Sequence, residues 1–168
     1  MKATGVVRRV DDLGRIVIPK EIRRTMHIRE GEPMEIFTDS SGSVIFKKYS
    51  PMGDIVMLAE QMAQALSKET DRPCVICDRD STVAGFGIKC EGRRLSQKVE
   101  SIMENRRAYK GRVELWDEGP ASELLVPIIA EGDLCGCIAL LENSREGGEC
   151  DLKLAQMAAG FMASQMES

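Results

Sequence analysis

The sequence TGVVRRVDDLGRIVIPKEIRRT, residues 4–25, carries the strongest local folding signals in the chain. Two runs rich in β-branched residues, Thr4–Val10 and Arg15–Ile18, favour short strands. Asp11–Gly14 lies between them and is typical of a turn that ends on glycine. A proline then follows the second run and suits the first turn of a helix, which the sequence predicts over Lys20–Met26.

Basic residues are concentrated at this end of the chain. Residues 1–29 hold eight Lys/Arg against three Asp/Glu, a net charge of +5, whereas the whole protein carries −4. Residues 1–49 hold ten Lys/Arg and seven Asp/Glu, for +3, and residues 50–168 hold thirteen and twenty, for −7. Residues 1–49 are thus a basic head and residues 50–168 an acidic body. This asymmetry suggests a polyanionic partner and a domain boundary near Ser50-Pro51.

The rest of the head predicts a hairpin. Met34–Thr38 and Val44–Lys48 have the composition of strands, and Asp39–Gly42 between them is a turn signal. Both faces of these strands carry apolar side chains, and a unit of about 50 residues buries little surface by itself. A second copy of the chain is the simplest cover, so we expect an obligate dimer at this end.

The acidic body predicts an α+β domain. Met52–Ser67 has apolar residues on one helical stripe, which indicates a helix. Further strands are expected at Cys74–Cys77, Thr82–Phe86, Val113–Trp116, Leu124–Ala130 and Leu134–Glu142, and further helices at Leu95–Arg106 and Asp151–Met166. Five strands with flanking helices are typical of a sensor-like α+β domain.

Several function classes find little support in the sequence. No apolar run approaches membrane-spanning length and the N-terminus lacks an apolar signal core, so we expect a cytoplasmic protein with reduced cysteines. A nucleophile motif and a glycine-rich phosphate loop are missing, and His27 is the single histidine. We therefore expect no enzyme, no catalytic residues and no cofactor.

The cysteines raise the question of a metal site. Cys74 and Cys77 form a CxxC, but positions i and i+3 of a strand point to opposite faces, and zinc usually needs two such pairs or added histidines. Cys135 and Cys137 are expected to share one strand face. Buried small side chains are the favoured interpretation for all of them, so we expect no metal.

Residues 4–25, with E-I-F at 35–37 and V-I-F-K-K-Y at 44–49, resemble the DNA-binding segment of AbrB-type transition-state regulators. P-I-I-A-E-G-D at 127–133 and A-A-G-F-M-A-S-Q-M-E at 158–167 are similar to sporulation regulators of this type that carry a C-terminal GAF-like domain. The resemblance implies a mixed fold, with a dimeric N-terminal swapped-hairpin β-barrel and a C-terminal α+β GAF-like domain. The expected domains are residues 1–50 for DNA binding, 51–70 for a linker helix and 71–168 for regulation and oligomerisation.

The resemblance also implies which residues contact DNA. They are Arg8, Arg15, Arg23 and Arg24, with Lys2, Arg9 and Lys20 as basic neighbours. Arginine suits phosphates and guanine edges, and most such contacts supply affinity rather than sequence choice. The predicted helix is too short to read a groove, so we expect recognition that depends on DNA shape. The alternative is a solvated face whose arginines pair with Asp11, Asp12, Glu21 and Glu30.

The expected function is therefore a nucleoid-associated transcription regulator of late sporulation genes that binds double-stranded DNA. It is expected to form a homodimer through residues 1–50 and a homotetramer through the C-terminal domain. Two alternatives remain open for the C-terminal domain. In one, it binds a small ligand under the loops Ile88–Leu95 and Lys110–Ser122, with Trp116 as a wall of the pocket. In the other, it is a dimerisation domain without a ligand. An antitoxin-like interaction module would need a toxin-binding tail where this chain has a folded domain, and an enzyme would need a catalytic constellation.

Overall fold

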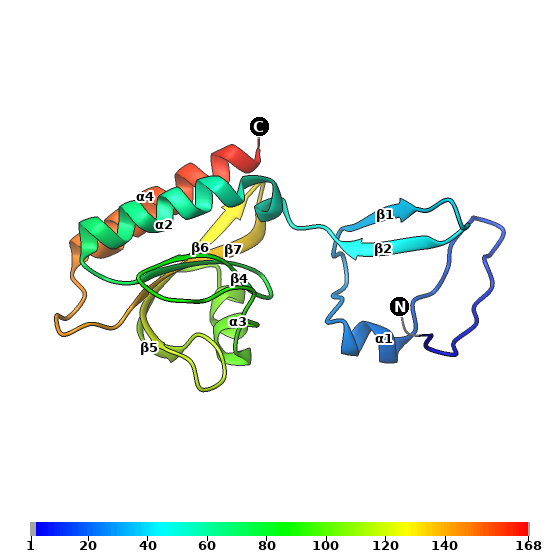
Figure 1. Cartoon of the computed structure of the whole chain (residues 1–168), viewed down its shortest axis with the longest axis horizontal. Helices are drawn as coiled ribbons and strands as arrows, with labels where there is room; N and C mark the ends of the chain where they lie inside the picture. Colours follow the sequence, from blue (N-terminus) through cyan, green and yellow to red (C-terminus); the bar gives the residue numbers. More distant parts are fainter. Residues whose placement is uncertain (1–2, 168) are drawn as a thin grey trace. The chain divides into compact units, whose positions relative to one another are not determined.

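A computed structural model describes residues 3–167 of the chain, and Figure 1 shows its elements. The chain divides into two compact units, Met1–Tyr49 and Ser50–Ser168, each with its own internal contacts. The mixed α/β fold expected from the sequence is confirmed.

The first unit contains a hairpin and one short helix. The helix α1 spans Lys20–Thr25, and the strands β1, Met34–Thr38, and β2, Val44–Lys48, pair antiparallel. The turn between the strands is held by Asp39, whose carboxylate accepts the backbone N–H groups of Ser41 and Ser43 at 2.9 Å each. Hydrogen bonds from Ser41 and Ser43 lower the pKa of Asp39 to about 2. The predicted helix and hairpin are confirmed.

The two strands predicted at Thr4–Val10 and Arg15–Ile18 are absent from the described single chain. A tight turn does join the two segments, with the Gly14 N–H donating to the Asp11 carbonyl at 3.0 Å. The strand prediction is therefore wrong for one chain taken alone. β-branched composition favours a strand, but its backbone N–H and C=O groups need a neighbouring strand to pair with.

The first unit has almost no core of its own. Among residues 3–49, Pro19 is the only buried residue. Of the seventeen large exposed apolar residues among residues 3–167, twelve lie in this unit. They are Val6, Val7, Val10, Leu13, Ile16, Val17, Met26, Ile36, Phe37, Val44, Phe46 and Tyr49. Apolar exposure of this extent in 49 residues marks an interaction surface.

The second unit is a five-stranded antiparallel sheet with helices on both faces. The sheet order is β4-β3-β7-β6-β5. Its strands are β3, Cys74–Asp78, β4, Thr82–Phe86, β5, Tyr109–Glu114, β6, Ala121–Ala130, and β7, Asp133–Leu141. Its helices are the 3₁₀ helix η1, Pro51–Ile55, and the α-helices α2, Val56–Thr70, α3, Gln97–Glu104, and α4, Glu149–Met166.

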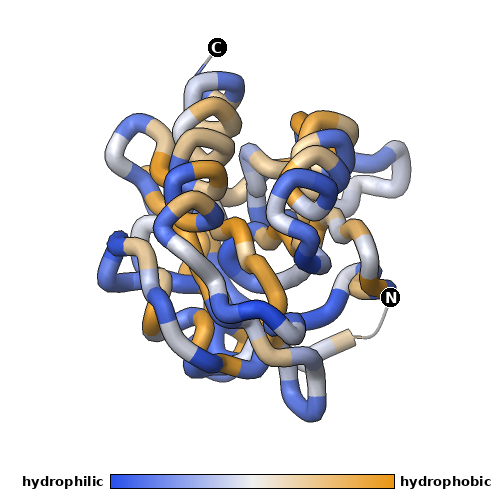
Figure 2. Tube along the Cα trace, turned by 90° about the vertical axis from the view of Figure 1, so that its left-hand side faces the viewer, coloured by the Kyte–Doolittle hydropathy of each residue, from blue (hydrophilic) through white to orange (hydrophobic). Residues whose placement is uncertain are grey.

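Two apolar cores lie on the two faces of this sheet. The helices α2 and α4 cover one face side by side (Figure 1). Ala59 of α2, Met162 of α4 and Met52 of η1 are fully buried there with Ile138 of the sheet. The helix α3 covers the other face and buries Val99 and other apolar residues. Figure 2 shows hydrophobic stretches, in orange, alternating with hydrophilic ones, in blue, along the helices. The segment expected as a linker helix thus contributes to the core of the second unit.

The positions of the cysteines in the two cores show on which face of the sheet each side chain lies. Cys74 lies in the core under α2 and α4, and Cys77 lies in the core under α3, so their predicted opposition is confirmed. Cys135 and Cys137 also lie in opposite cores, so the prediction that they share a face is wrong. A register shift opposite Ile128 and Ile129 inserts an extra residue in β7 and reverses the alternation.

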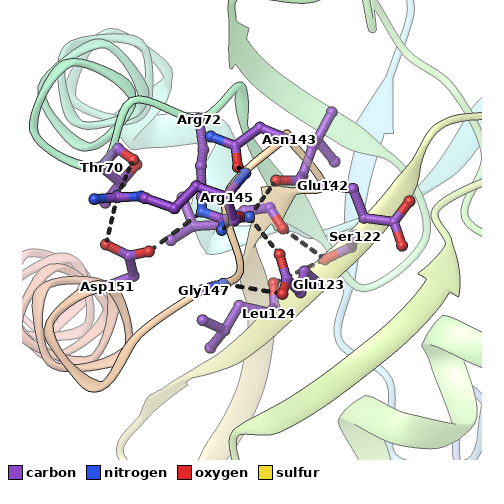
Figure 3. Close-up of polar contacts among 12 residues, drawn as sticks. Thr70, Arg72, Ser122, Glu123, Leu124, Glu142, Asn143, Arg145, Gly147 and Asp151 are labelled. Carbon is purple, nitrogen blue, oxygen red and sulfur yellow. Dashed lines mark hydrogen bonds and ion pairs between the residues drawn. The ribbon is translucent and has the colours of Figure 1, made fainter.

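A buried arginine connects the ends of the helical layer. Arg72 follows α2 and its side chain is fully buried. Its Nε lies 3.2 Å from Oδ2 of Asp151 in α4, and its Nη1 donates to Glu123 in β6 and to the Leu141 carbonyl at 3.0 Å. It also donates to the Arg145 carbonyl (Figure 3). The two carboxylates balance a charge that would otherwise be costly to bury.

Candidate nucleic-acid interface

The predicted DNA-contacting residues lie on three neighbouring segments of the first unit. Arg8 and Arg9 belong to the arm before the turn, Arg15 follows the turn, and Lys20, Arg23 and Arg24 belong to α1. All six are exposed. Lys2 lies outside the described residues.

Arg15 is held by an acid in its own turn. The Asp11 Oδ1 atom accepts the backbone N–H groups of Leu13 at 3.0 Å and of Arg15 at 2.7 Å. The other oxygen, Oδ2, lies 2.8 Å from Arg15 Nε. Backbone and side-chain hydrogen bonds from Arg15 lower the pKa of Asp11. The side chain of Arg15 nevertheless remains 71% exposed, so its terminal nitrogens face solvent.

The other cations are arranged differently. Arg23 donates from Nε to the Ile18 carbonyl at 3.2 Å, which fixes the guanidinium beside the start of α1 without neutralising it. Within residues 3–167, Arg15 is the only one of the six with an ion pair. Asp12, Glu21 and Glu30, which the alternative interpretation pairs with arginines, form no ion pair with them. A surface of unneutralised arginines suits phosphate binding.

A second acid has a role that the sequence analysis missed. The Glu32 side chain is 6% exposed and lies 3.5 Å from Arg29 Nη1 and 3.3 Å from Lys48 Nζ. Lys48 also donates to the carbonyl of His27 at 2.6 Å. His27 has a φ of 51°, the left-handed conformation that ends a helix. These contacts join the end of α1 to β2, and the Arg29-x-x-Glu32 spacing was the available sequence signal.

An apolar cavity lies beside these residues in the first unit. Its volume is about 590 Å³. Its walls include Ile16, Ile18, Ile22 and Phe46, with the cations Arg8, Lys47 and Lys48 also lining it. The cavity is large enough for several side chains, and its apolar walls match apolar rather than charged occupants.

Metal sites and membrane-spanning segments are two further features that could carry a function. Within the described part of the chain, no group of three or more His, Cys, Asp or Glu is placed to hold a metal ion. Helices of the length and apolarity needed to cross a bilayer are likewise missing from residues 3–167.

Comparison with known proteins divides along the same two units. Residues 7–54 match the family described as antidote-toxin recognition MazE, bacterial antitoxin, and residues 54–167 match the family described as stage V sporulation protein T C-terminal, transcription factor. The transition state regulatory protein AbrB of Bacillus subtilis (strain 168) is 55% identical over 51 residues, which cover 30% of this chain and 52% of that protein.

The second unit resembles solved GAF domains in fold. The blue-light absorbing form of the Thermosynechococcus elongatus PixJ GAF-domain superposes with a TM-score of 0.54 at 14% identity, covering 71% of this chain and 89% of that one. This likeness supports the GAF-like fold alone. The predicted AbrB-like head and GAF-like body are confirmed.

An AbrB-like head joined to a GAF-like body defines a class of transcription factor. The stage V sporulation protein T of Bacillus subtilis (strain 168) is 43% identical to this chain over 177 aligned residues, which cover 99% of each protein. The chain belongs to the stage V sporulation protein T family.

Proposed function

We propose that this protein regulates late sporulation genes by binding double-stranded DNA through Arg8, Arg15, Arg23 and Arg24, with Lys2, Arg9 and Lys20 adding charge. The observation that supports it most is the set of exposed arginines of which only Arg15 has an ion pair within the described chain. The B. subtilis relative, whose name assigns it to stage V of sporulation, supports the biological setting.

The DNA-binding surface belongs to a homodimer of residues 1–50. Residues 3–49 hold twelve large exposed apolar side chains and a single buried residue, so the head has no core of its own. A second copy that inserts its own strands into the apolar cavity supplies that core. Strands from the partner also pair with the backbone of residues 4–10 and 15–18, where the sequence favours strands and the described single chain forms none. The dimer brings two sets of arginines onto one DNA-binding surface.

The second unit joins two dimeric heads into a tetramer and senses a small ligand. Met57 on α2 and Met157 and Phe161 on α4 are 74%, 67% and 47% exposed. These two helices lie side by side, so a second copy of the pair covers them and makes a homotetramer with two heads. Linking two heads raises avidity through effective concentration. In the cell the protein is cytoplasmic and associated with the nucleoid, and the GAF-like fold supports a ligand-sensing role.

A gel shift with charge-reversed variants tests the DNA contacts. Arg15→Glu and Arg23→Glu should each abolish retention of a promoter fragment, while sedimentation shows the assembly unchanged. Wild-type affinity in both variants would remove the basis for the assignment. Arg107→Glu, an exposed arginine of the second unit, is the matched control and should retain the DNA.

An antitoxin-like interaction module is the second candidate, because residues 7–54 match an antitoxin family. In this chain a folded unit with two apolar cores follows the head, where such a module would carry its toxin-binding tail. Salt titration separates the two functions. DNA affinity should fall steeply as the salt concentration rises, whereas a toxin-binding module would show no specific retention of DNA at any salt concentration.

A further inference from the structure

A groove of about 570 Å³ lies between α3 and the edge strand β5. Gln97, Lys98 and Ser101 of α3 line one wall, and Tyr109 and Arg112 of β5 line the other. The floor is apolar and consists of Ile102 and Val113. An apolar floor with a few converging polar groups is typical of a small-molecule site.

The two cations of this groove have unused donors. Lys98 is exposed and forms no ion pair with any residue from 3 to 167. Arg112 uses Nε to contact Glu142 Oε1 at 2.9 Å. A guanidinium donates from three nitrogens, so this contact orients Arg112 and leaves its two terminal nitrogens for another acceptor. The pair therefore offers an ammonium and a fork of N–H groups across one groove.

The space between α3 and the sheet, in contrast, is filled. Val99 and Leu115 are fully buried there, and Met103 is 2% exposed. Trp116, expected as the wall of a pocket, packs against this same core together with Ile88. A ligand in the groove on the outer side of α3 would thus not displace this core.

The charge distribution of the second unit indicates the sign of the charge on a ligand that would bind in the groove. Residues 89–112 hold eight Lys/Arg and three Asp/Glu, a net charge of +5, in a unit that carries −7 overall. The remainder of the unit therefore carries −12. A local positive potential of this kind attracts small anions to the groove.

We propose that the groove between α3 and β5 binds a small anionic metabolite whose phosphate or carboxylate group is held by Lys98 and Arg112. Gln97 and the Tyr109 hydroxyl hydrogen-bond the polar part of the molecule, and Ile102 and Val113 contact its apolar part. This deepens the ligand-sensing role in the proposed function, but the binding event itself does not depend on DNA.

The test is thermal unfolding of the full chain, followed by the fluorescence of Trp116, the single tryptophan. Phosphate, pyrophosphate and citrate are titrated against sodium chloride at matched ionic strength. At least one of them should raise the unfolding temperature, because binding to the folded state stabilises it. Lys98→Gln and Arg112→Gln should each weaken the apparent Kd about tenfold, and Lys68→Gln on α2 should leave it unchanged.

Three results of the titration would overturn the proposal. The first is no response to any of the anions, and the second is the same response in Lys98→Gln as in Lys68→Gln. The third is anion binding that Arg24→Gln weakens and Lys98→Gln does not, since the site would then lie in the basic head. Gel shifts distinguish free anions from DNA phosphates: Lys98→Gln should retain full DNA affinity, and a loss comparable to that of Arg24→Gln would make the groove a DNA contact instead.

Discussion

Asp11 binds Arg15 twice, through the backbone N–H at 2.7 Å and through Nε at 2.8 Å. An acid in the middle of a basic surface would be expected to weaken DNA binding by neutralising a cation. Here the carboxylate uses one oxygen to build the turn and the other to orient the guanidinium. Asp11 is thus a positioning residue for Arg15. It neutralises part of the positive charge of Arg15 and in return fixes the orientation of the guanidinium.

The Asp11 carboxyl should titrate below its usual value of 3.8, because hydrogen bonds from Arg15 favour the charged form. The support that it gives to the turn is present above pH 3.8 and is lost as the pH falls through the lowered pKa. Side-chain ¹³C NMR of the full chain measures the midpoint. Arg15→Gln removes the side-chain contact and should raise the midpoint part of the way, since the backbone hydrogen bond remains. A midpoint at or above 3.8 in the wild type would contradict the geometry.

Arg24→Gln should weaken binding to all DNA sequences by a similar factor. The Arg24 side chain has no ion pair within the described chain, so in the proposed complex it is available to a phosphate. Each lost phosphate contact reduces the slope of log affinity against log salt by about 0.9. Fluorescence anisotropy across a salt series measures the slope, with Arg107→Gln of the second unit as the control. A slope identical in all three proteins would mean that Arg24 makes no phosphate contact.

The sequence predicted most of the second unit because its signals are local and its cores lie within one chain. The helix α4 was predicted as Asp151–Met166 and is found as Glu149–Met166. The head shows the opposite case. The composition of residues 4–18 correctly indicates a preference for strands, but the partner that would pair with them is outside the single chain. Local propensity indicates that a segment prefers to form a strand, but it does not show whether a second strand is present to pair with it.

The cysteines show a second limit of sequence reasoning. A strand alternates faces with a period of two, so Cys135 and Cys137 were assigned to one face. The bulge in β7 inserts one residue between Leu134 and Cys137 and reverses the assignment. In the candidate interface, the exposure of the arginines could be predicted from their charge. The hydrogen bonds between Asp11 and Arg15 could not be predicted, because they depend on the geometry of the turn.

Arg72→Met should destabilise the second unit by about 3–5 kcal/mol, because it leaves Glu123 and Asp151 without their buried cation. Urea unfolding followed by Trp116 fluorescence measures the loss in that unit alone. Arg145→Met is the matched control: its side chain is 62% exposed and lies 3.7 Å from Asp151, so the expected cost is below about 1 kcal/mol. Equal losses in the two variants would show that the buried charge pairs do not hold the helical layer.

Cys150 should be the one cysteine that reacts rapidly with a thiol reagent in the folded protein. It is exposed, whereas the other five cysteines are buried. Burial raises the pKa of the Cys74 thiol, and a hydrogen bond with Cys137, together with burial, raises the pKa of the Cys77 thiol. A colorimetric thiol assay at pH 8 should show one fast equivalent per chain and the others only on unfolding. Cys150→Ser should abolish the fast phase, and a second fast equivalent would contradict the burial.

Val17→Asp should dissociate the head and abolish DNA binding, although Val17 is 69% exposed in the single chain. The side chain lines the apolar cavity, which the proposed dimer fills. Burying valine contributes about 1.5–3 kcal/mol, and a carboxylate in its place adds a desolvation cost in both copies. Sedimentation of the full chain measures assembly. Ser40→Asp, exposed at the hairpin tip, introduces the same charge and should leave assembly intact. Unchanged assembly in Val17→Asp would exclude this cavity as the dimer core.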